Sequence, residues 1–224
     1  EMLRSLVGSE MCIRDSPQLH QPGRQYTKAI LGHDTSAPSP IACPVFDETP
    51  HELTTEEVWD NIHMFGDAAV RAKKAGFDGV EIHAGHGYLV QQFLSQFSNR
   101  RFDEFGGSIE NRARFACEIC KDIKKKCGED YPVIIKLSGE EKVPGGMTIS
   151  DTKIIAKYLE EAGYDAIEVT ICNYASLDWM SAPEDEPMGF NAYNAEKIKE
   201  GVHIPVAAID RINTPEIAED IIAV

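Results

Sequence analysis

The sequence has no apolar run that approaches the roughly 20 residues of a membrane-spanning helix. It is also short of basic residues, with 22 Lys and Arg against 37 Asp and Glu, and its formal net charge is -15. Such an acidic surface disfavours nucleic acid and anionic membranes as partners, although it leaves room for a local basic pocket that binds a phosphate. We therefore expect a soluble, cytoplasmic protein with no nucleic-acid or membrane partner.

A disulfide framework is also missing. Cys12 lies in an N-terminal segment that we set aside below, and the remaining cysteines are odd in number and without a framework spacing: Cys43, Cys117, Cys120, Cys127 and Cys172. This usage suits a reducing cytoplasm. The spacing Cys117-x-x-Cys120 with Cys127 also fits an iron–sulfur or zinc site, but Cys120 and Cys127 fall on a helical stripe with Ile109, Ala113, Ala116 and Ile123. The pattern therefore favours small core residues.

Diagnostic spacings for two further kinds of binding site are absent. The Gly-x-Gly-x-x-Gly fingerprint of dinucleotide-binding sheets does not occur. A zinc site needs at least three protein ligands, and although His20, His33, Glu81 and Asp103 are of a suitable type, none lies at a diagnostic spacing. We therefore predict no metal.

Residues 1–16 differ in character from the rest of the chain. Residues 6–16 are similar to the translation of a transposon-type DNA sequencing adapter, which encodes Glu-Met-Cys-Ile-Arg-Asp. A signal peptide does not fit, because Glu1, Glu10 and Asp15 are acidic and no sustained apolar core is present. We expect residues 1–16 to be non-native and to pack against nothing, so that the native sequence begins near Pro17.

What is present, from about residue 53 onward, is an alternation of helix and strand signals. Caps and helical spacing of apolar residues predict helices over 54–76, 108–126, 150–162 and 193–200, and from 214 onward. Short apolar runs predict strands over 77–82, 133–137, 166–170 and 204–209. Residues 75–82 and 162–169 are similar in sequence, each a helix end, a tight turn and a buried strand. The pattern predicts an α/β protein with a parallel sheet, and by itself fits both a barrel and a doubly wound sheet.

His83, His86 and Tyr88 lie where the strand 77–82 gives way to a glycine-containing loop. Side chains at the exit of a strand are fixed at the base and open at the tip. Two neutral imidazoles that converge on one point can donate two N–H bonds to a carbonyl oxygen, and a nearby tyrosine can supply a proton. Taken alone, however, a His-x-x-His pair is structural or incidental roughly half the time.

A longer motif narrows the interpretation. The histidine segment is followed by Gln92-Phe93-Leu94-Ser95 and then by Asn99-Arg100-Arg101-Phe102-Asp103-Glu104-Phe105-Gly106-Gly107-Ser108-Ile109-Glu110-Asn111-Arg112. Together they resemble the signature of the old yellow enzyme family of NADH:flavin oxidoreductases and ene-reductases, which includes the enoate and 2,4-dienoyl-CoA reductases. The resemblance implies an eight-stranded (β/α)8 TIM barrel. Aligned on that family, residues 17–224 are expected to form a partial flavin-binding barrel, a truncated fragment with about strands three to seven.

The resemblance also implies a reaction. Members of the family bind FMN, accept hydride from NADH or NADPH, and pass it through the flavin to the C=C bond of an α,β-unsaturated carbonyl compound. His83 and His86 match the pair that bonds the substrate carbonyl, and Tyr88 matches the proton donor found in many members. We expect an enzyme of this class whose substrate is a small molecule with an activated alkene, and we expect activity from the complete barrel rather than from the fragment alone.

Three further positions match flavin contacts of the family. Gln18 matches the glutamine that bonds the pyrimidine edge of the flavin. Lys136 stands where an arginine is usual, next to flavin N1 and O2, and keeps the positive charge without the bidentate fork. Arg211 lies at the phosphate end of strand seven. A 4Fe-4S cluster and FAD are expected only in a C-terminal region beyond this chain, and a homo-oligomer only for the full-length protein.

Two departures from the family pattern keep other functions open. Gln21 stands where a histidine is common, in the family sequence Gln-Leu-x-His-x-Gly-Arg. Asp210 stands where a glycine that helps to seat the flavin phosphate is expected, and a carboxylate beside a phosphate dianion is repulsive. One alternative is therefore a degenerate, non-catalytic barrel that binds a phosphorylated ligand. A related flavin amine dehydrogenase is the other, although that class tends to hold tyrosine at the position of His83.

Overall fold

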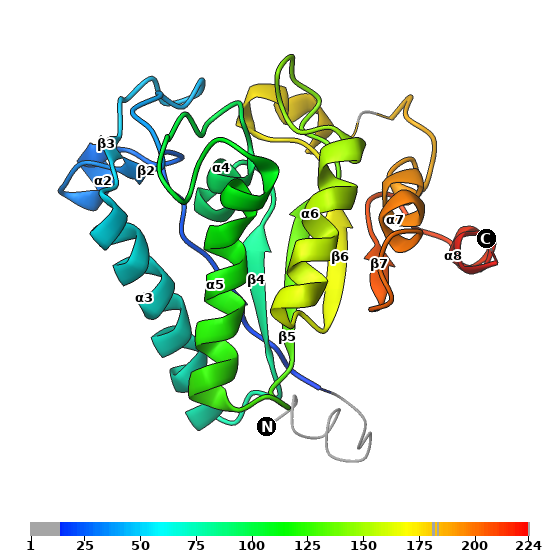
Figure 1. The fold of residues 1–224 in the computed structure, drawn as a ribbon. Helices are drawn as coiled ribbons and strands as arrows, with labels where there is room; N and C mark the ends of the chain where they lie inside the picture. Colours follow the sequence, from blue (N-terminus) through cyan, green and yellow to red (C-terminus); the bar gives the residue numbers. More distant parts are fainter. Residues whose placement is uncertain (1–13, 181, 183, 224) are drawn as a thin grey trace, which may run out of the picture.

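A five-stranded parallel sheet in the order β1-β4-β5-β6-β7 forms the centre of the molecule (Figure 1). The structure is a computed structural model, and it describes residues 14–180, 182 and 184–223. The strands are β1 (Gln18–Leu19), β4 (Val80–Ala84), β5 (Val133–Ser138), β6 (Ala166–Thr170) and β7 (Val206–Ala208). A separate parallel pair consists of β2 (Ser36–Ala37) and β3 (His51–Glu52). The predicted α/β class with a parallel sheet is confirmed.

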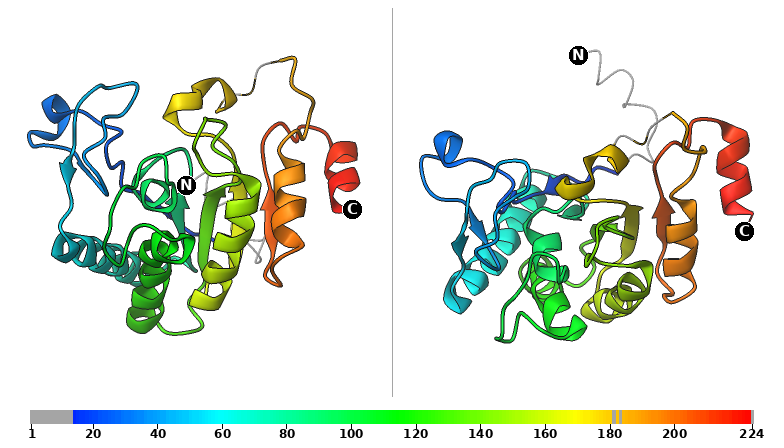
Figure 2. Two further views of the ribbon diagram at one scale, coloured as in Figure 1. Left: turned by 45° about the horizontal axis from the view of Figure 1, so that its top comes forward. Right: turned by 90° about the horizontal axis from the view of Figure 1, so that it is seen from above.

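The long helices connect successive strands and lie side by side on one side of the sheet (Figures 1 and 2). They are α3 (Thr55–Lys74), α5 (Ile109–Cys127), α6 (Ile149–Ala162) and α7 (Ala192–Lys199). Thr54, Ser108 and Thr148 cap the first three, each side chain accepting a hydrogen bond from the backbone N–H three residues on. A doubly wound sheet carries helices on both faces. In the described part of the chain, the long helices cover one face of the sheet, so the arrangement does not match a doubly wound sheet.

The sheet has two faces of opposite character, because side chains alternate along a strand. The apolar face packs against the helices, and its residues are 0% exposed: Val80, Ile82, Val133, Ile135, Leu137, Ile167 and Val169. The polar face carries Glu81, His83, Lys136, Ser138, Glu168 and Thr170. Strand register aligns His83 with Lys136 and Lys136 with Glu168 across β4, β5 and β6. His83, Lys136 and Glu168 therefore lie on the same face of three neighbouring strands.

Four further helical segments complete the described part of the chain. They are α2 (Lys28–Leu31), α4 (Leu89–Leu94), the 3-10 segment η1 (Tyr174–Trp179) and α8 (Pro215–Ile222). Only α8 was predicted from the sequence, from the proline at its first turn. All six residues of α4 are buried, so its sequence lacks the helical spacing of apolar residues on one face by which an amphipathic helix is recognised.

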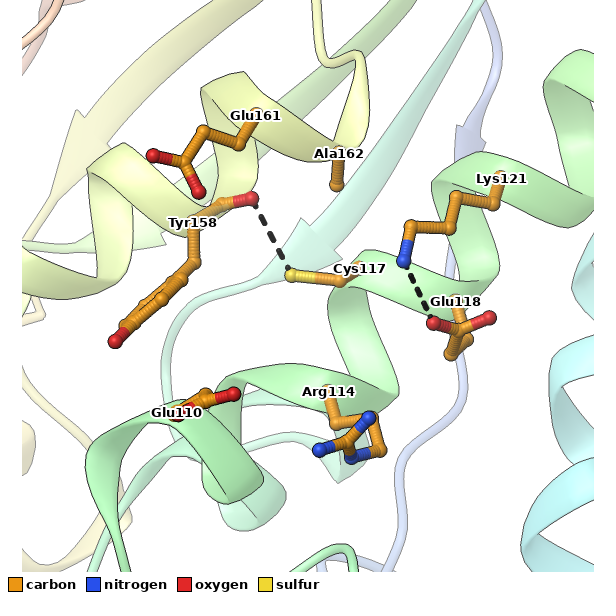
Figure 3. Close-up of a pocket in the computed structure, with 8 residues that line it drawn as sticks. All are labelled: Glu110, Arg114, Cys117, Glu118, Lys121, Tyr158, Glu161 and Ala162. Atoms are coloured by element: carbon orange, nitrogen blue, oxygen red, sulfur yellow. Dashed lines mark hydrogen bonds and ion pairs between the residues drawn. The ribbon is translucent and has the colours of Figure 1, made fainter.

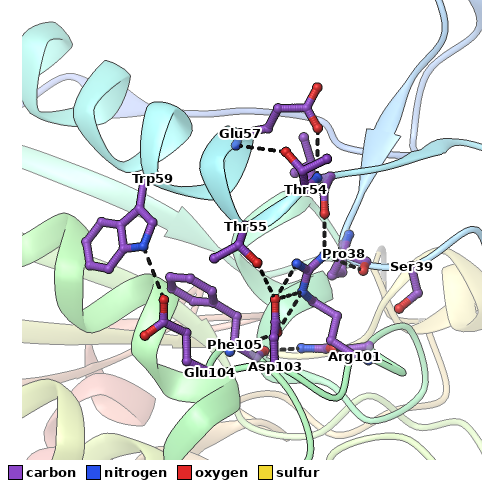
Figure 4. Close-up of polar contacts among 12 residues, drawn as sticks. Pro38, Ser39, Thr54, Thr55, Glu57, Trp59, Arg101, Asp103, Glu104 and Phe105 are labelled. Carbon is purple, nitrogen blue, oxygen red and sulfur yellow. Dashed lines mark hydrogen bonds and ion pairs between the residues drawn. The ribbon is translucent and has the colours of Figure 1, made fainter.

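The second half of the sequence motif holds the loop between α4 and α5 in place (Figure 4). Arg101 is buried, and its guanidinium donates to the carbonyls of Pro38 and Leu53 and to the carboxylate of Asp103. Asp103 also accepts from Thr55, at the start of α3. A Cβ at Gly106 would lie 2.3 Å from the carbonyl oxygen of Arg101, which accounts for glycine there. These motif residues therefore serve the architecture of the loop.

The chain enters the sheet alongside β4. Residues 1–13 of the segment interpreted as adapter lie outside the described residues, but Asp15 and its neighbours lie within them. The N–H of Asp78 donates to the carbonyl of Asp15 at 2.9 Å, and the N–H of Glu81 donates to the carbonyl of Pro17 at 3.0 Å. The expectation that residues 1–16 pack against nothing is therefore wrong for Asp15. Any residue in an extended segment can accept such a hydrogen bond through its backbone carbonyl, whatever its side chain. This contact therefore does not show whether the segment is native.

Candidate active site

His83 and His86 come together at the carboxyl end of β4. His83 is the fourth residue of the strand and is 7% exposed, and His86 follows in the turn after it. The Nε2 atom of His83 lies 3.3 Å from Nδ1 of His86. On its far side, Nε2 of His86 lies 2.9 Å from the hydroxyl of Thr170, at the end of β6. The strand thus fixes the first ring, and the turn brings the second ring onto it.

The hydrogen bonds around the pair define which nitrogens carry protons. The backbone N–H of Gly85 donates to Nδ1 of His83 at 3.2 Å, so the proton of a neutral His83 resides on Nε2. That Nε2–H donates to Nδ1 of His86, whose own proton then resides on Nε2 and is donated to Thr170. The predicted pair is brought together, but its N–H groups are directed at each other and at Thr170 rather than at one common point.

Both imidazoles are neutral at neutral pH. Burial is the main cause that lowers the pKa of His83 from 6.5 to about 3, and the neighbouring His86 makes a smaller contribution to that shift. Burial likewise lowers the pKa of His86 to about 4, with a smaller contribution from the positive charge of Lys136. Neutral imidazoles donate hydrogen bonds without the charge of an imidazolium.

Tyr88 closes the site from the side of the loop. Its hydroxyl lies 3.0 Å from the hydroxyl of Tyr174, which belongs to η1 after β6. The ring of His20 packs edge-on against Tyr88 at 4.2 Å between centroids and lies 5.4 Å from the ring of His83. Burial, and then the hydrogen bond with Tyr174, raise the pKa of Tyr88 well above its ordinary value. The phenol therefore keeps its proton at neutral pH.

Two charge-assisted pairs lie on the polar face beneath the histidines. Lys136 donates from Nζ to Oε1 of Glu168 at 2.6 Å, and Gln18 donates from Nε2 to Oε2 of Glu81 at 2.5 Å. Burial raises the pKa of Glu81, an effect that the hydrogen bond from Gln18 opposes. The structure thus brings Gln18 and Lys136 to the same face as His83, each already bonded to a carboxylate.

Asp210 and Arg211 follow β7, and both adopt left-handed backbone conformations, with φ of 81° and 55°. This region favours glycine, which is the residue expected at position 210 from the family pattern. The side chain of Asp210 accepts a hydrogen bond at 2.9 Å from Nδ2 of Asn191, a residue that is 0% exposed. Burial raises the pKa of Asp210. The carbonyl of Arg211 accepts from the N–H of Gly189 at 3.1 Å.

Comparison with known proteins identifies the family to which this chain belongs. A model of the NADH:flavin oxidoreductase / NADH oxidase family matches residues 17–224. The chain belongs to this family. It is 47% identical over 207 residues to an NADH oxidase of Thermoanaerobacter brockii and 41% identical over 216 residues to a cinnamate reductase of Clostridium sporogenes. These alignments cover 92% and 89% of the chain, respectively, and 32% of each relative.

Solved structures of the NADH:flavin oxidoreductase family share the fold. A 2-naphthoyl-CoA reductase complex superposes with a TM-score of 0.85 at 31% identity, covering 92% of this chain and 33% of that one. The chain therefore spans about a third of the length of the relatives described. The resemblance to old yellow enzymes that the sequence motifs indicated is confirmed.

The family name implies a flavin, and the residues on the polar face fit one end of it. Lys136 offers a cation and Gln18 an amide, which are the donors that the pyrimidine edge of a flavin accepts, and both lie on the face that carries His83. The carboxylates of Glu81 and Glu168 orient these donors. Asp210 does not fit a phosphate, because its carboxylate is a negative charge held in place by Asn191.

Four residues of this site were not predicted for it from the sequence. A signal for Glu168 was present, because the repeated segments 75–82 and 162–169 place Glu81 and Glu168 at the same position. Thr170 ends the same strand two residues later, on the same face. His20 and Tyr174 come from segments without a periodic pattern, and only the fold brings them to Tyr88.

A hollow of about 230 Å³ lies between α5 and α6 (Figure 3), and none of the residues that line it is a predicted site residue. Cys117 lines it and donates to the carbonyl of Tyr158. Burial raises the pKa of this thiol to about 12, so it is not a nucleophile at neutral pH. Cys120 and Cys127 are also free and belong to the core of α5, as predicted.

Two kinds of feature were not found in the described part of the chain. Among residues 14–180, 182 and 184–223, no group of three or more His, Cys, Asp or Glu side chains is arranged to hold a metal ion. None of the described helices combines the length and the apolar character needed to cross a membrane.

Proposed function

We propose that this chain forms part of an FMN-dependent ene-reductase barrel that reduces the C=C bond of an α,β-unsaturated carbonyl compound. His83 and His86 hold the carbonyl oxygen, and Tyr88 supplies a proton. The observation that carries the proposal is the pair of neutral imidazole nitrogens that face each other at 3.3 Å at the end of β4, beside a protonated tyrosine.

The one-sided helical cover supports an eight-stranded barrel, in which the polar face of the sheet is the inner wall and the strand ends form the catalytic face. Gln18 and Lys136 would hold the pyrimidine end of FMN, with Arg211 near its phosphate end. When bound, the flavin supplies hydride that comes from NADH or NADPH. The name of one relative, cinnamate reductase, denotes reduction of an unsaturated carboxylate and favours this substrate class.

The facing nitrogens support a way for both rings to hold one oxygen. Without substrate, Nδ1 of His86 accepts from His83, and Nε2 of His86 donates to Thr170. A threonine hydroxyl is both donor and acceptor, so it can turn and donate to Nε2 of His86, whose proton then resides on Nδ1. Both rings now donate to the same oxygen, which gains negative charge as hydride reaches the β-carbon. Thr170 thereby sets which nitrogen of His86 donates.

Tyr88 supports the second half of the reaction. Its phenol keeps its proton at neutral pH, so it can donate that proton to the α-carbon of the substrate. Tyr174, whose hydroxyl lies 3.0 Å away and whose ring is only partly buried, connects Tyr88 to the surface. The proton that Tyr88 gives up is replaced through this contact.

The test uses stopped-flow absorbance of the two half-reactions in the flavin-loaded protein. Changing His83 or His86 to alanine is expected to slow alkene reduction by about 100- to 1000-fold, the usual effect of losing one oxyanion donor. Thr170→Val is expected to slow it by about tenfold, because it removes the hydroxyl that settles the His86 tautomer. Reduction of the flavin by NADH or NADPH should continue in all three variants. His63→Ala, on the exposed side of α3, is the matched control.

A specific outcome would overturn the assignment. If the His83 and His86 variants lose flavin reduction but keep alkene reduction, the pair does not hold the unsaturated carbonyl. Absence of flavin absorbance from the purified, complete barrel would favour the non-catalytic alternative, in which the barrel binds another phosphorylated ligand.

A further inference from the structure

The turn that presents His86 is held in an unusual backbone conformation. His86 and Gly87 have φ of 55° and 75°, so two successive residues are left-handed. Gly87 adopts this region freely, but a residue with a side chain such as histidine does so at a cost, and persists there only where its surroundings fix it. Something in the surroundings must therefore hold the turn.

Four side chains from three separate segments provide that support. The N–H of His86 donates to the hydroxyl of Ser138 in β5, at 3.2 Å, and its carbonyl accepts from the amide of Gln25, at 2.9 Å. The N–H of Gly87 donates to Oε1 of Gln91 in α4, at 2.8 Å, and its carbonyl accepts from Nε2 of Gln92, at 2.7 Å. Every backbone donor and acceptor of the two residues is therefore paired with a side chain.

Glu141, together with the carbonyl of Cys172 at 3.3 Å, determines which way the amide of Gln91 faces. Glu141 is 1% exposed, and it accepts hydrogen bonds from Nε2 of Gln91 at 2.8 Å, from the backbone N–H of Met147 at 2.7 Å and from the hydroxyl of Ser95. A carboxylate that accepts at both oxygens has no hydrogen to donate. Gln91 must therefore turn its NH2 group toward Glu141, and its oxygen is left to accept the N–H of Gly87.

We propose that Glu141 is a positioning residue for His86 and acts through Gln91. Its carboxylate fixes the Gln91 amide, the amide oxygen fixes the left-handed turn, and the turn brings Nδ1 of His86 to Nε2 of His83. The catalytic value of this chain of contacts rests on the proposed function of the histidine pair. The structural link from Glu141 to the Gly87 N–H does not, so the two can be tested separately.

Exchanging the two side chains of the link provides a sharp test. Gln91→Glu sets a second carboxylate against Glu141, where neither partner can donate. Glu141→Gln places one N–H against another, at Gly87 or at Met147 according to how the new amide turns. The double variant Gln91→Glu with Glu141→Gln restores one donor facing one acceptor, with an acceptor again facing Gly87. Only the double variant should therefore recover the native turn.

The first readout is hydrogen–deuterium exchange of the Gly87 amide in the full chain without flavin. Gln91→Glu is expected to speed this exchange by tenfold or more, because repulsion between two buried carboxylates moves the side chain that accepts the Gly87 N–H, and the double variant is expected to reverse most of that change. Glu140→Gln is the matched control, because it is the same chemical change at the preceding residue, which pairs with Lys142 and not with Gln91. If Gln91→Glu does not fold, Gln91→Met gives the same readout without a second charge.

The second readout is the pair of half-reactions in the flavin-loaded protein. Gln91→Glu should slow alkene reduction while flavin reduction continues, and the double variant should recover alkene reduction together with Gly87 protection. Unchanged Gly87 exchange in Gln91→Glu, or no recovery in the double variant, would overturn the positioning role. Protection that follows the expected pattern in a protein whose wild type reduces no activated alkene would instead overturn the proposed function and leave the link from Glu141 to Gly87 standing.

Discussion

The two faces of the central sheet are built by the same strands and differ in almost every physical respect. On the apolar face, Ile135 of β5 and Val169 of β6 are 0% exposed and pack against helices. Their neighbours in sequence, Lys136 and Glu168, lie on the polar face, where they are partly exposed and form an ion pair with each other. Alternation along each strand makes this division possible, because neighbours in sequence point to opposite sides.

The difference separates what stabilises the molecule from what performs chemistry in it. Burial of aliphatic side chains is the main favourable contribution to folding. The polar face buries histidines and carboxylates, and the lowered pKa of His83 and raised pKa of Glu81 show that their charged forms are disfavoured there. Such groups are typical of sites that bind or transform a ligand.

The largest expected effect comes from removing a side chain on the apolar face. Ile135→Ala should lower the free energy of unfolding by about 3 kcal/mol, because it removes buried methylene and methyl groups and leaves a cavity. Ile134→Ala is the matched control, since Ile134 is the preceding residue of β5 on the other face and is only partly buried. It should cost about 1 kcal/mol or less. Urea unfolding of both variants measures the difference, and equal losses would mean that the two faces contribute alike.

Most of the fold followed from the sequence because periodicity reports the apolar face directly. The predicted strand 166–170 and the observed β6 coincide, and the predicted helix over 54–76 corresponds to α3 within two residues at each end. Prediction failed for α4, which is buried on every side, and for β2 and β3, which have two residues each. Such elements are defined by their neighbours and not by a local pattern.

The site was only partly predictable, for a related reason. His83, His86 and Tyr88 are close in sequence, so one motif identified them together. Thr170 and Tyr174 lie more than 80 residues away, and the pairing of β4, β5 and β6 brings Thr170 to His86 and Tyr174 to Tyr88. The direction in which the N–H group of His86 points could not be predicted from the sequence either, because the tautomer of His86 depends on the Gly85 N–H and the Thr170 hydroxyl.

A second effect should appear as pH dependence that originates on the polar face. His83 and His86 have pKa values of about 3 and 4 in the folded protein, against 6.5 when exposed, so the unfolded chain binds more protons between these limits. The free energy of unfolding should therefore fall as pH falls from about 6.5 to about 4, by up to about 1.4 kcal/mol per pH unit for each histidine.

Urea unfolding at a series of pH values measures this slope. His86→Asn should make it shallower, because one of the two groups no longer titrates, and His33→Asn is the control at an exposed position. A slope that His86→Asn leaves unchanged would mean that other groups cause the loss of stability in acid.

The smallest effect on stability is expected at Lys136, and it sharpens the contrast between the faces. Lys136→Met removes an ion pair with Glu168 whose side chains are 17% and 28% exposed, so the free energy of unfolding should change by only about 1 kcal/mol or less. The pKa of His86 should rise above about 4, because the positive charge that opposes its protonation is gone. Under the proposed function, affinity for FMN should fall, because the pyrimidine edge of the ring loses the Lys136 ammonium as a hydrogen-bond donor. Urea unfolding, histidine NMR titration and FMN titration measure the three quantities. A loss of stability as large as that of Ile135→Ala would show that the polar face also holds the fold together, and the division between the faces would then be wrong.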